Sequence, residues 1–305
     1  MRVVFFGTAA FAVPAIKQIT GQHKIVLCIT QPDRPQGRGL SVEASSVKQA
    51  ALALNIPLAQ PQRLTLADVA SVSADIGVVA AYGQLIRREV IDHFPHGILG
   101  IHPSLLPKFR GAAPVAWAIL SGETMTGVTI FRINEALDAG PTLLRREVAI
   151  GPHESAETLT ERLAEMGAEE TLRAMEWINS GEAVFTPQAE AAATLAPKLS
   201  KSQCPIDWTQ PAIQIDRQVR ALIPWPGAVA AWQGQPLKIW QAEIAAGKTA
   251  AAFKPGSVVD CSGDQLVVAT GDGALAIQQL QLPGKKKVTA KEFLSGYRVS
   301  IGDRF

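Results

Sequence analysis

The sequence predicts an α/β protein with a doubly wound, largely parallel sheet first and a small β-barrel after it. Three observations support this fold class. The chain opens with a strand at 2–6, a helix at 9–20 and a second strand at 24–30, which is typical of parallel strands joined by a crossover helix. A long amphipathic helix follows at 154–180. Beyond residue 208, a single helix at 212–222 precedes several short strands separated by Gly and Asp turns, as in a small barrel.

Apolar runs and turn residues place the other elements of the first part. The expected strands are 75–80, 98–102, 128–133 and 142–150, and the expected helices are 47–54, 87–94 and 115–120. After the first strand, Gly7 has no second or third glycine with the spacing that a dinucleotide phosphate needs. This pattern argues against NAD or FAD as a ligand.

Length and composition indicate two well-packed domains. The chain has 305 residues, of which 47% are hydrophobic and 18% charged, so a disordered protein is excluded. From 188 to 197 the composition changes to Ala, Glu, Thr and Pro without periodicity, which is typical of a linker. We therefore expect domains at 1–188 and 209–305, joined by a linker at 189–208.

Charge and cysteine content limit the compartment and the partners. The three cysteines, Cys28, Cys204 and Cys261, lack the paired spacing of a zinc site, and no apolar stretch is long enough for a membrane span or signal peptide. A cytoplasmic protein without metal or membrane association is therefore expected. Residues 198–305 carry 13 basic and 8 acidic residues, a net charge of +5, which allows a polyanionic partner but is also ordinary for a solvated surface.

Two polar residues follow buried strands and can meet at one sheet edge. His102 ends the strand 98–102, and Pro103 and Pro107 stiffen the loop after it. Asp138 lies in the loop 134–140, which follows the strand 128–133. A histidine beside a carboxylate suits general acid–base chemistry, although a lone histidine near a loop proline is more often structural.

These stretches resemble the folate-dependent formyltransferases. The matching residues are His102-Pro103-Ser104-Leu105-Leu106-Pro107 and Leu137-Asp138-Ala139-Gly140, and the opening at 5–12 matches as well. The resemblance implies a Rossmann-like formyltransferase domain followed by an OB-like β-barrel. It also implies 10-formyltetrahydrofolate as the formyl donor, with no metal. One position departs from the pattern, because Gly100 stands where the family has an asparagine.

The resemblance assigns roles to individual residues of this chain. His102 would donate to the developing oxyanion, Asp138 would accept the amine proton directly or through water, and Thr129 would position that carboxylate or its water. The implied folate-binding residues are Ser104, Leu105, Leu106, Pro107, Tyr82, Gly83, Gln84 and Leu85.

The remaining matches favour the methionyl-tRNA formyltransferases within this family. They comprise residues 30–39, residues 198–208, the run Pro224-Trp225-Pro226-Gly227 and the basic barrel. The implied partner is initiator methionyl-tRNA, and we expect a monomer. The implied tRNA contacts are Arg34, Arg38, Lys201, Lys285, Lys286 and Lys287, although a triple lysine is also typical of a solubilising turn.

Gly100 leaves alternatives open. Loss of one oxyanion donor typically costs about 2.7 to 4 kcal/mol of transition-state stabilisation. Three explanations compete for the missing asparagine donor. Another side chain or a water takes its place, the enzyme is slow, or the chain is a catalytically impaired relative that binds tRNA. A formyltransferase for an amino sugar or other small amine is the alternative among active enzymes.

Overall fold

The computed structural model describes residues 1–36, 41–245 and 252–305. Contacts within the chain divide it into two units. The first unit comprises residues 1–114, 125–149 and 160–197. The second comprises residues 115–124, 150–159 and 198–305.

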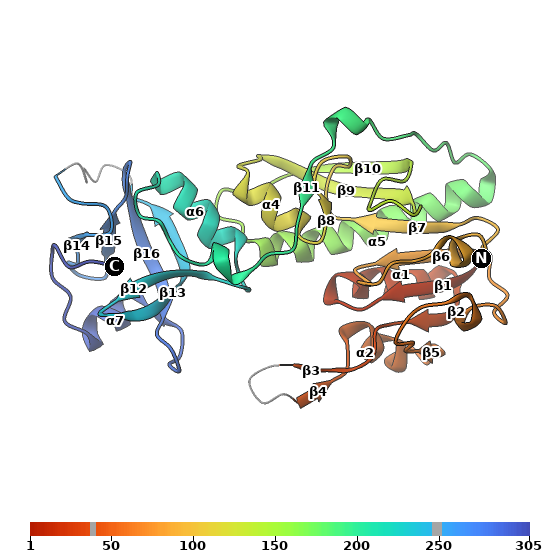
Figure 1. Ribbon diagram of the computed structural model, residues 1–305, viewed down its shortest axis with the longest axis horizontal. Helices are drawn as coiled ribbons and strands as arrows, with labels where there is room; N and C mark the ends of the chain where they lie inside the picture. Colours follow the sequence, from red (N-terminus) through yellow and green to blue (C-terminus); the bar gives the residue numbers. More distant parts are fainter. Residues whose placement is uncertain (37–40, 246–251) are drawn as a thin grey trace. The chain divides into compact units, whose positions relative to one another are not determined.

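The first unit is built on a seven-stranded sheet (Figure 1). In spatial order its strands are β10 (Thr142–Ala149), β9 (Met125–Arg132), β7 (Ile98–His102), β6 (Ile76–Ala80), β1 (Arg2–Gly7), β2 (Lys24–Ile29) and β5 (Leu58–Ala59). The strands from β7 to β5 pair in parallel, whereas β9 and β10 are antiparallel additions at one edge.

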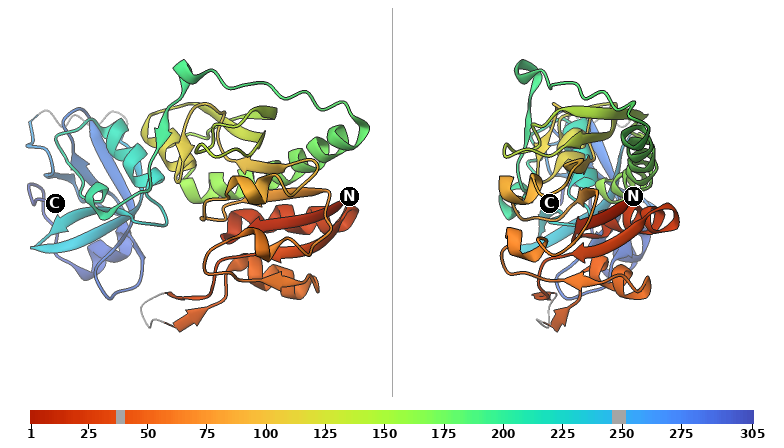
Figure 2. Two further views of the ribbon diagram at one scale, coloured as in Figure 1. Left: turned by 45° about the vertical axis from the view of Figure 1, so that its right-hand side comes forward. Right: turned by 90° about the vertical axis from the view of Figure 1, so that its right-hand side faces the viewer.

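The centre of this sheet is covered on both faces. Val3, Val4, Phe5 and Phe6 of β1 are all fully buried, as expected for the central strand of a doubly wound fold. The helices α1 (Val13–Gln22) and α5 (Ala156–Ser180) lie on the same face, where Gln18 Nε2 donates to Glu165 Oε2 at 3.5 Å (Figure 2).

A glycine brings α5 close to the sheet. A Cβ built on Gly167 would lie 2.7 Å from Ile101 Cγ2, so a larger residue there would force the helix away from β7. Ile101 and the neighbouring Val128 therefore face α5. Because side chains alternate along a strand, Gly100 and His102 face the opposite side of the sheet.

The opposite face packs against shorter elements and loops. These include η2 (Leu66–Asp68) and α3 (Arg88–Ile91), and the core there contains Phe6, Leu64, Tyr82, Phe94 and Ile98. The helix α2 (Ser46–Ala53) instead packs against α1. The order of the strands reverses direction between β1 and β6. Ligands of such sheets bind outside the carboxyl ends of the strands near this reversal, which is also the edge where β7 ends at His102.

Short pairings extend the first unit beyond the predicted elements. The loop expected at 31–39 contains a strand, β3 (Arg34–Gln36), that pairs with β4 (Ser41–Glu43). Farther along, β8 (Arg110–Gly111) pairs in parallel with β11 (Leu195–Ala196), and the 3₁₀ turn η3 (Glu190–Ala192) lies just before β11. The predicted linker thus supplies part of the first unit.

The second unit contains a curled antiparallel sheet. Its strands in spatial order are β12 (Ala228–Trp232), β13 (Gln235–Ile244), β16 (Ala274–Gln281), β15 (Leu266–Ala269) and β14 (Val258–Asp260), and β17 (Val288–Thr289) also pairs with β16. Two register irregularities in the β13–β16 pairing, between Ile239 and Ala242, are of the kind that bends a strand.

Two of the helices in the second unit contribute to its core, through residues such as Ile215, Val219 and Phe293. α4 (Pro114–Leu120), η4 (Lys201–Gln203) and α6 (Ala212–Ala221) precede the sheet, and α7 (Ala290–Gly296) follows it. Thr289 and Glu292 form a capping box at the start of α7, a helix that the strand pattern did not predict. The predicted fold class is confirmed. None of the helices in the described ranges combines the length and apolar character needed to cross a membrane.

Candidate active site

His102 lies at the carboxyl end of β7 with its ring buried. Its Nε2 is 2.8 Å from the carbonyl oxygen of Phe109, and because a carbonyl only accepts, Nε2 carries a hydrogen and donates it. The other ring nitrogen, Nδ1, lies 3.7 Å from Asp138 Oδ2. Nδ1 is therefore the ring atom that remains for chemistry, on the side of the carboxylate.

Asp138 reaches this position from the loop between β9 and β10. Its φ of 49° is in the left-handed region, which few residues other than glycine adopt, so the surrounding structure must hold the loop in place. The main-chain N–H of Gly111 donates to Asp138 Oδ2 at 2.8 Å. The two candidate catalytic residues thus come together at one sheet edge, as their positions after two strands predicted.

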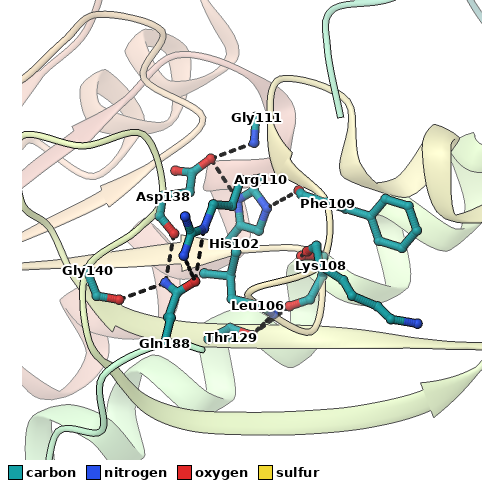
Figure 3. A network of polar contacts seen from close by, with 11 residues as sticks. His102, Leu106, Lys108, Phe109, Arg110, Gly111, Thr129, Asp138, Gly140 and Gln188 are labelled. Atoms are coloured by element: carbon teal, nitrogen blue, oxygen red, sulfur yellow. Dashed lines mark hydrogen bonds and ion pairs between the residues drawn. The ribbon is translucent and has the colours of Figure 1, made fainter. Parts of the chain in front are cut away.

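Gln188 holds the Asp138 loop from the other side. Its side-chain Nε2 donates to the carbonyl oxygens of Asp138 at 2.8 Å and Gly140 at 2.7 Å (Figure 3). Its Oε1 accepts from Arg110 Nε at 3.1 Å and Nη2 at 2.8 Å. All the hydrogen-bonding capacity of this buried amide is used, so the amide fixes the backbone on both sides of Ala139.

Arg110 connects Gln188 with the loop that follows His102. Besides Gln188, its guanidinium donates to Glu190 at 3.0 Å and 2.7 Å. These hydrogen bonds raise the pKa of Arg110 and lower the pKa of Glu190. The guanidinium is buried whereas the carboxylate of Glu190 is 71% exposed. The buried positive charge is therefore compensated by an amide oxygen and by a carboxylate at the surface.

The loop after His102 is braced from within by hydroxyl groups. Thr129 Oγ1 donates to the carbonyl oxygen of Ser104 at 2.6 Å and accepts from the N–H of Leu106 at 3.1 Å. Ser104 is itself buried, and its hydroxyl donates to the carbonyl oxygen of Lys108 at 2.6 Å. The hydrogen bonds of Thr129 thus hold the loop after His102, and its predicted role toward Asp138 or a water stays a prediction. Ser104 braces the same loop.

Position 100 has no room for a side chain. Gly100 pairs directly with Phe131 of the neighbouring strand, and a Cβ built on Gly100 would lie 2.4 Å from Phe131 Cε1. The space that the family's asparagine side chain would need is thus filled by the side chain of Phe131. That side chain is an apolar ring, so it replaces the volume of an amide without replacing its hydrogen bond.

The turn after β6 lies beside the end of β7. The carbonyl oxygen of Tyr82 accepts from Thr8 Oγ1 at 2.8 Å and from Gln31 Nε2 at 2.7 Å, which ties this turn to the end of β1. The Tyr82 ring is in the core, where burial raises the pKa of its hydroxyl to about 12. Leu85 is 70% exposed. Of the two, only Leu85 has an exposed side chain, and the Tyr82 carbonyl is already engaged within the protein.

The other predicted folate-binding residues, in segments 82–85 and 104–107, also include both buried and exposed side chains. Gln84 Oε1 accepts from the N–H of Leu64, and Gly83 has a left-handed φ of 80° in the exposed turn. Leu106 is buried, whereas Leu105 and Pro107 are partly exposed. The eight residues expected to bind folate therefore lie in two adjoining segments at the carboxyl ends of β6 and β7.

The predicted tRNA contacts are exposed where the structure describes them. Arg34, Lys201, Lys285, Lys286 and Lys287 are all exposed, and Arg38 lies outside the described residues. The three consecutive lysines form the turn between β16 and β17. Lys238 Nζ lies 3.8 Å and Lys287 Nζ 5.2 Å from the centre of the Trp240 ring, a cation–π arrangement that the sequence analysis did not identify.

Comparison with known proteins decides the family. The formyl transferase model matches residues 1–175, and the model of the formyl transferase C-terminal domain matches residues 198–298. The chain belongs to the formyl transferase family. The methionyl-tRNA formyltransferase of Solibacter usitatus is 44% identical over 309 residues, covering 100% of this chain and 98% of that protein. The protein of the same name from Aromatoleum aromaticum is also 44% identical, over 310 residues, covering 100% of this chain and 97% of that protein.

Solved structures of formyl transferase relatives share the fold. HypX from Aquifex aeolicus, crystallised with tetrahydrofolic acid, superimposes with a TM-score of 0.69 at 21% identity, covering 99% of this chain and 48% of HypX. WlaRD, a sugar 3N-formyl transferase, superimposes with a TM-score of 0.70 at 19% identity, covering 94% of this chain and 99% of WlaRD. At these identities the likeness supports the fold alone.

Sequence reasoning missed three residues of this formyl transferase site. Arg110 was noted only as part of a loop, and Gln188 and Glu190 were placed at the start of a linker. The one visible signal for Gln188 and Glu190 was that they are polar side chains in a segment without periodicity. That signal does not distinguish a solvated linker from a segment that forms hydrogen bonds with the protein. Phe131 was assigned to a strand without regard to Gly100, because the register of β7 against β9 is not visible in the sequence.

Proposed function

We propose that this chain transfers the formyl group of 10-formyltetrahydrofolate to the amino group of initiator methionyl-tRNA. The observation that carries the proposal is the full-length match to the methionyl-tRNA formyltransferases, which includes both domains. The pairing of the buried His102 with the partly exposed Asp138 supports it. The proposal places the protein in the cytoplasm as a monomer, with a catalytic domain at 1–188 and a tRNA-binding domain at 209–305.

The transfer requires one C–N bond to form and another to break. The amino nitrogen of the methionyl group attacks the formyl carbon, and the carbonyl oxygen becomes an oxyanion. The bond from that carbon to N10 of the folate then breaks, and N10 takes up a proton as the amine loses one. The site must therefore hold two nitrogens close to one carbon and move a proton between them.

His102 and Asp138 are arranged for this proton movement. Nε2 is committed to the Phe109 carbonyl, so the ring meets the substrate through Nδ1. Nδ1 lies 3.7 Å from Asp138 Oδ2, so a proton on Nδ1 can be donated to the oxyanion or to the leaving nitrogen beside that carboxylate. Asp138 accepts the amine proton directly or through a water. The Gly111 N–H and the Gln188 amide keep the carboxylate in place throughout.

The carboxyl ends of β6 and β7 fit a flat, partly apolar donor. The exposed Leu85 follows β6 and the partly exposed Leu105 follows β7, so both provide apolar surface near the strand exits. The left-handed backbone at Ala81 and Gly83 opens the turn beside them. Residues 82–85 and 104–107 would hold the folate, leaving its formyl group facing His102.

The second unit offers the groups that bind a nucleic acid backbone. Lys285, Lys286 and Lys287 are exposed on one turn, and Lys201 is exposed in η4. Neutralising phosphates with such side chains makes binding salt-dependent. Replacing the three turn lysines with alanine should raise the KM for tRNA and reduce its salt dependence, while the KM for folate stays unchanged. The exposed Lys17, replaced in the same way, serves as the control.

The decisive experiment compares acceptors. The purified protein is incubated with 10-formyltetrahydrofolate and either methionyl-tRNA or a nucleotide-linked amino sugar, and formylated product and tetrahydrofolate are measured together. Equal amounts of formylmethionyl-tRNA and tetrahydrofolate support the proposal, and the Asp138→Asn variant should produce neither above background. Formylation of the sugar alone would replace tRNA as the substrate. Binding of tRNA without transfer to either acceptor would favour the catalytically impaired alternative.

A further inference from the structure

Beside His102, the ring of Phe131 on β9 occupies the space that a side chain at position 100 of the neighbouring strand β7 would need. Gly100 of β7 and Phe131 of β9 are direct partners in the antiparallel register. A Cβ on Gly100 would lie 2.4 Å from Phe131 Cε1, 2.7 Å from its Cζ and 2.8 Å from Ile133 Cδ1. Since carbon atoms in contact are normally about 3.5 to 4.0 Å apart, the ring tip lies where a side chain of residue 100 would be.

The same ring contacts His102 from the side. Gly100 and His102 are two residues apart and face the same side of the sheet. The centres of the His102 and Phe131 rings are 6.4 Å apart and their planes meet at 86°, an edge-to-face arrangement. Phe131 can reach His102 in this way only because Gly100 leaves the intervening space open.

Three contacts then surround the imidazole. Phe109 accepts the hydrogen bond of Nε2, Asp138 lies beyond Nδ1, and Phe131 borders the ring laterally. Phe131 is 2% exposed, so it is packed on its own far side and cannot easily move away. Rotation of the imidazole about its bond to Cβ would press it against this ring.

We propose that Phe131 is a positioning residue for His102, and that Gly100 is its obligatory partner. The ring holds the imidazole in the orientation that directs Nδ1 toward Asp138, and it acts through His102 without touching a reacting atom. The proposal rests on the proposed formyl transfer for its kinetic consequences, but its packing consequences are independent of any substrate.

The first test replaces the Phe131 ring with a shorter apolar side chain. Phe131→Leu keeps an apolar residue but removes the atoms that reach over Gly100. We expect kcat to fall by about 10-fold or more while the KM values for folate and tRNA change less than about twofold, because small misplacements of catalytic groups are costly. Phe94→Leu is the matched control, since Phe94 is also buried in the first unit but packs on Phe6, near the opposite end of β7.

Kinetics alone would not separate positioning from a general loss of packing. The pH dependence of kcat and the NMR signals of the His102 ring nitrogens should change in Phe131→Leu and stay as in the wild type in Phe94→Leu, with both variants folded. If Phe131→Leu matches the control in kcat, pH profile and imidazole signals, the proposal is wrong.

The second test uses the fact that Gly100 and Phe131 share one space, so that a larger residue 100 requires a smaller residue 131. Gly100→Ala alone should lower thermal stability and kcat, because its Cβ collides with the ring tip. In the Phe131→Leu background the colliding Cε1 and Cζ atoms are gone, and the one close atom left is Ile133 Cδ1, the end of a flexible side chain. Adding Gly100→Ala should therefore cost much less stability. Equal effects of Gly100→Ala in both backgrounds would show that the two positions are uncoupled and would overturn the proposal.

These measurements also separate this inference from the proposed function. If the wild-type protein formylates no methionyl-tRNA, the substrate assignment fails. The stability coupling between positions 100 and 131 and the imidazole signals still decide whether Phe131 orients His102.

Discussion

The side-chain nitrogen of Gln188 lies 2.8 Å from the carbonyl oxygen of Asp138, although 50 residues separate them in the chain. Asp138 has a left-handed φ, and this hydrogen bond together with the bond to Gly140 holds that conformation. The placement of the Asp138 carboxylate beside His102 therefore depends on a residue far along the chain that bonds to the Asp138 backbone.

Replacing Gln188 with leucine should weaken both folding and catalysis. The change leaves two buried carbonyls and part of the Arg110 guanidinium without partners, so the free energy of unfolding should fall by about 2 to 4 kcal/mol. kcat should fall more than the folate KM rises, because Asp138 loses its placement. Chemical denaturation and steady-state kinetics measure both. Glu190→Ala is the control, since it keeps the Gln188 amide in place, and equal losses in the two variants would contradict this role.

The Glu190 carboxylate should make stability depend on acid pH. Its pKa is lowered in the folded protein by the hydrogen bond from Arg110. A lowered folded pKa means that the stabilisation is present above the unfolded pKa of about 4.3 and is lost as pH falls through the folded value.

Glu190→Gln should therefore be less stable than the wild type at pH 7, with a difference that shrinks as the pH falls below about 4. Urea denaturation of both proteins across this range gives the comparison. A difference that is constant with pH would mean that the Arg110–Glu190 pair contributes nothing through its charge.

Thr129→Val should loosen the loop after His102. Valine has nearly the same volume but neither donates to Ser104 nor accepts from Leu106, which leaves both buried backbone groups without a partner. We expect a loss of about 1 to 3 kcal/mol in unfolding free energy and a raised KM for folate. Thr126→Val, at a buried position farther back on β9, should leave the folate KM unchanged.

Cys28 should resist thiol reagents in the native state. It is fully buried in β2, and burial raises the pKa of its thiol to about 12, so hardly any thiolate forms at pH 8. Cys204 and Cys261 are partly exposed. Titration with an aromatic disulfide reagent should release up to two equivalents of thiolate from the native protein and three in denaturant. Rapid release of a third equivalent without denaturant would disprove this.

The sequence predicted the framework of the fold because apolar runs and turn residues are local signals. The strand 98–102 has the predicted bounds, and the first sheet is largely parallel as predicted. The short β3–β4 hairpin and the helix α7 were missed. The Thr289–Glu292 capping pattern was present in the sequence but was overlooked.

The positions of the two candidate catalytic residues were predictable, whereas the residues that hold them in place were not. His102 and Asp138 each follow a strand, and the topology of parallel sheets brings strand exits together. Gln188, Arg110 and Phe131 depend on strand register and on a segment without periodicity, both of which are set by tertiary packing. Thr129 was identified as a site residue, but its polar partners proved to be in the Ser104–Leu106 loop.

The pairing of β8 with β11 bears on how this protein matures during synthesis. The N–H groups of Phe109 and Arg110 bond to the side chain and carbonyl of Thr194, so the active-site loop receives its last partners from residues made about 85 positions later. A ribosome-bound chain that has exposed only its first 188 residues would have its sheet but an unsecured catalytic loop. The shortest fragment with a complete site should therefore extend through Ala196.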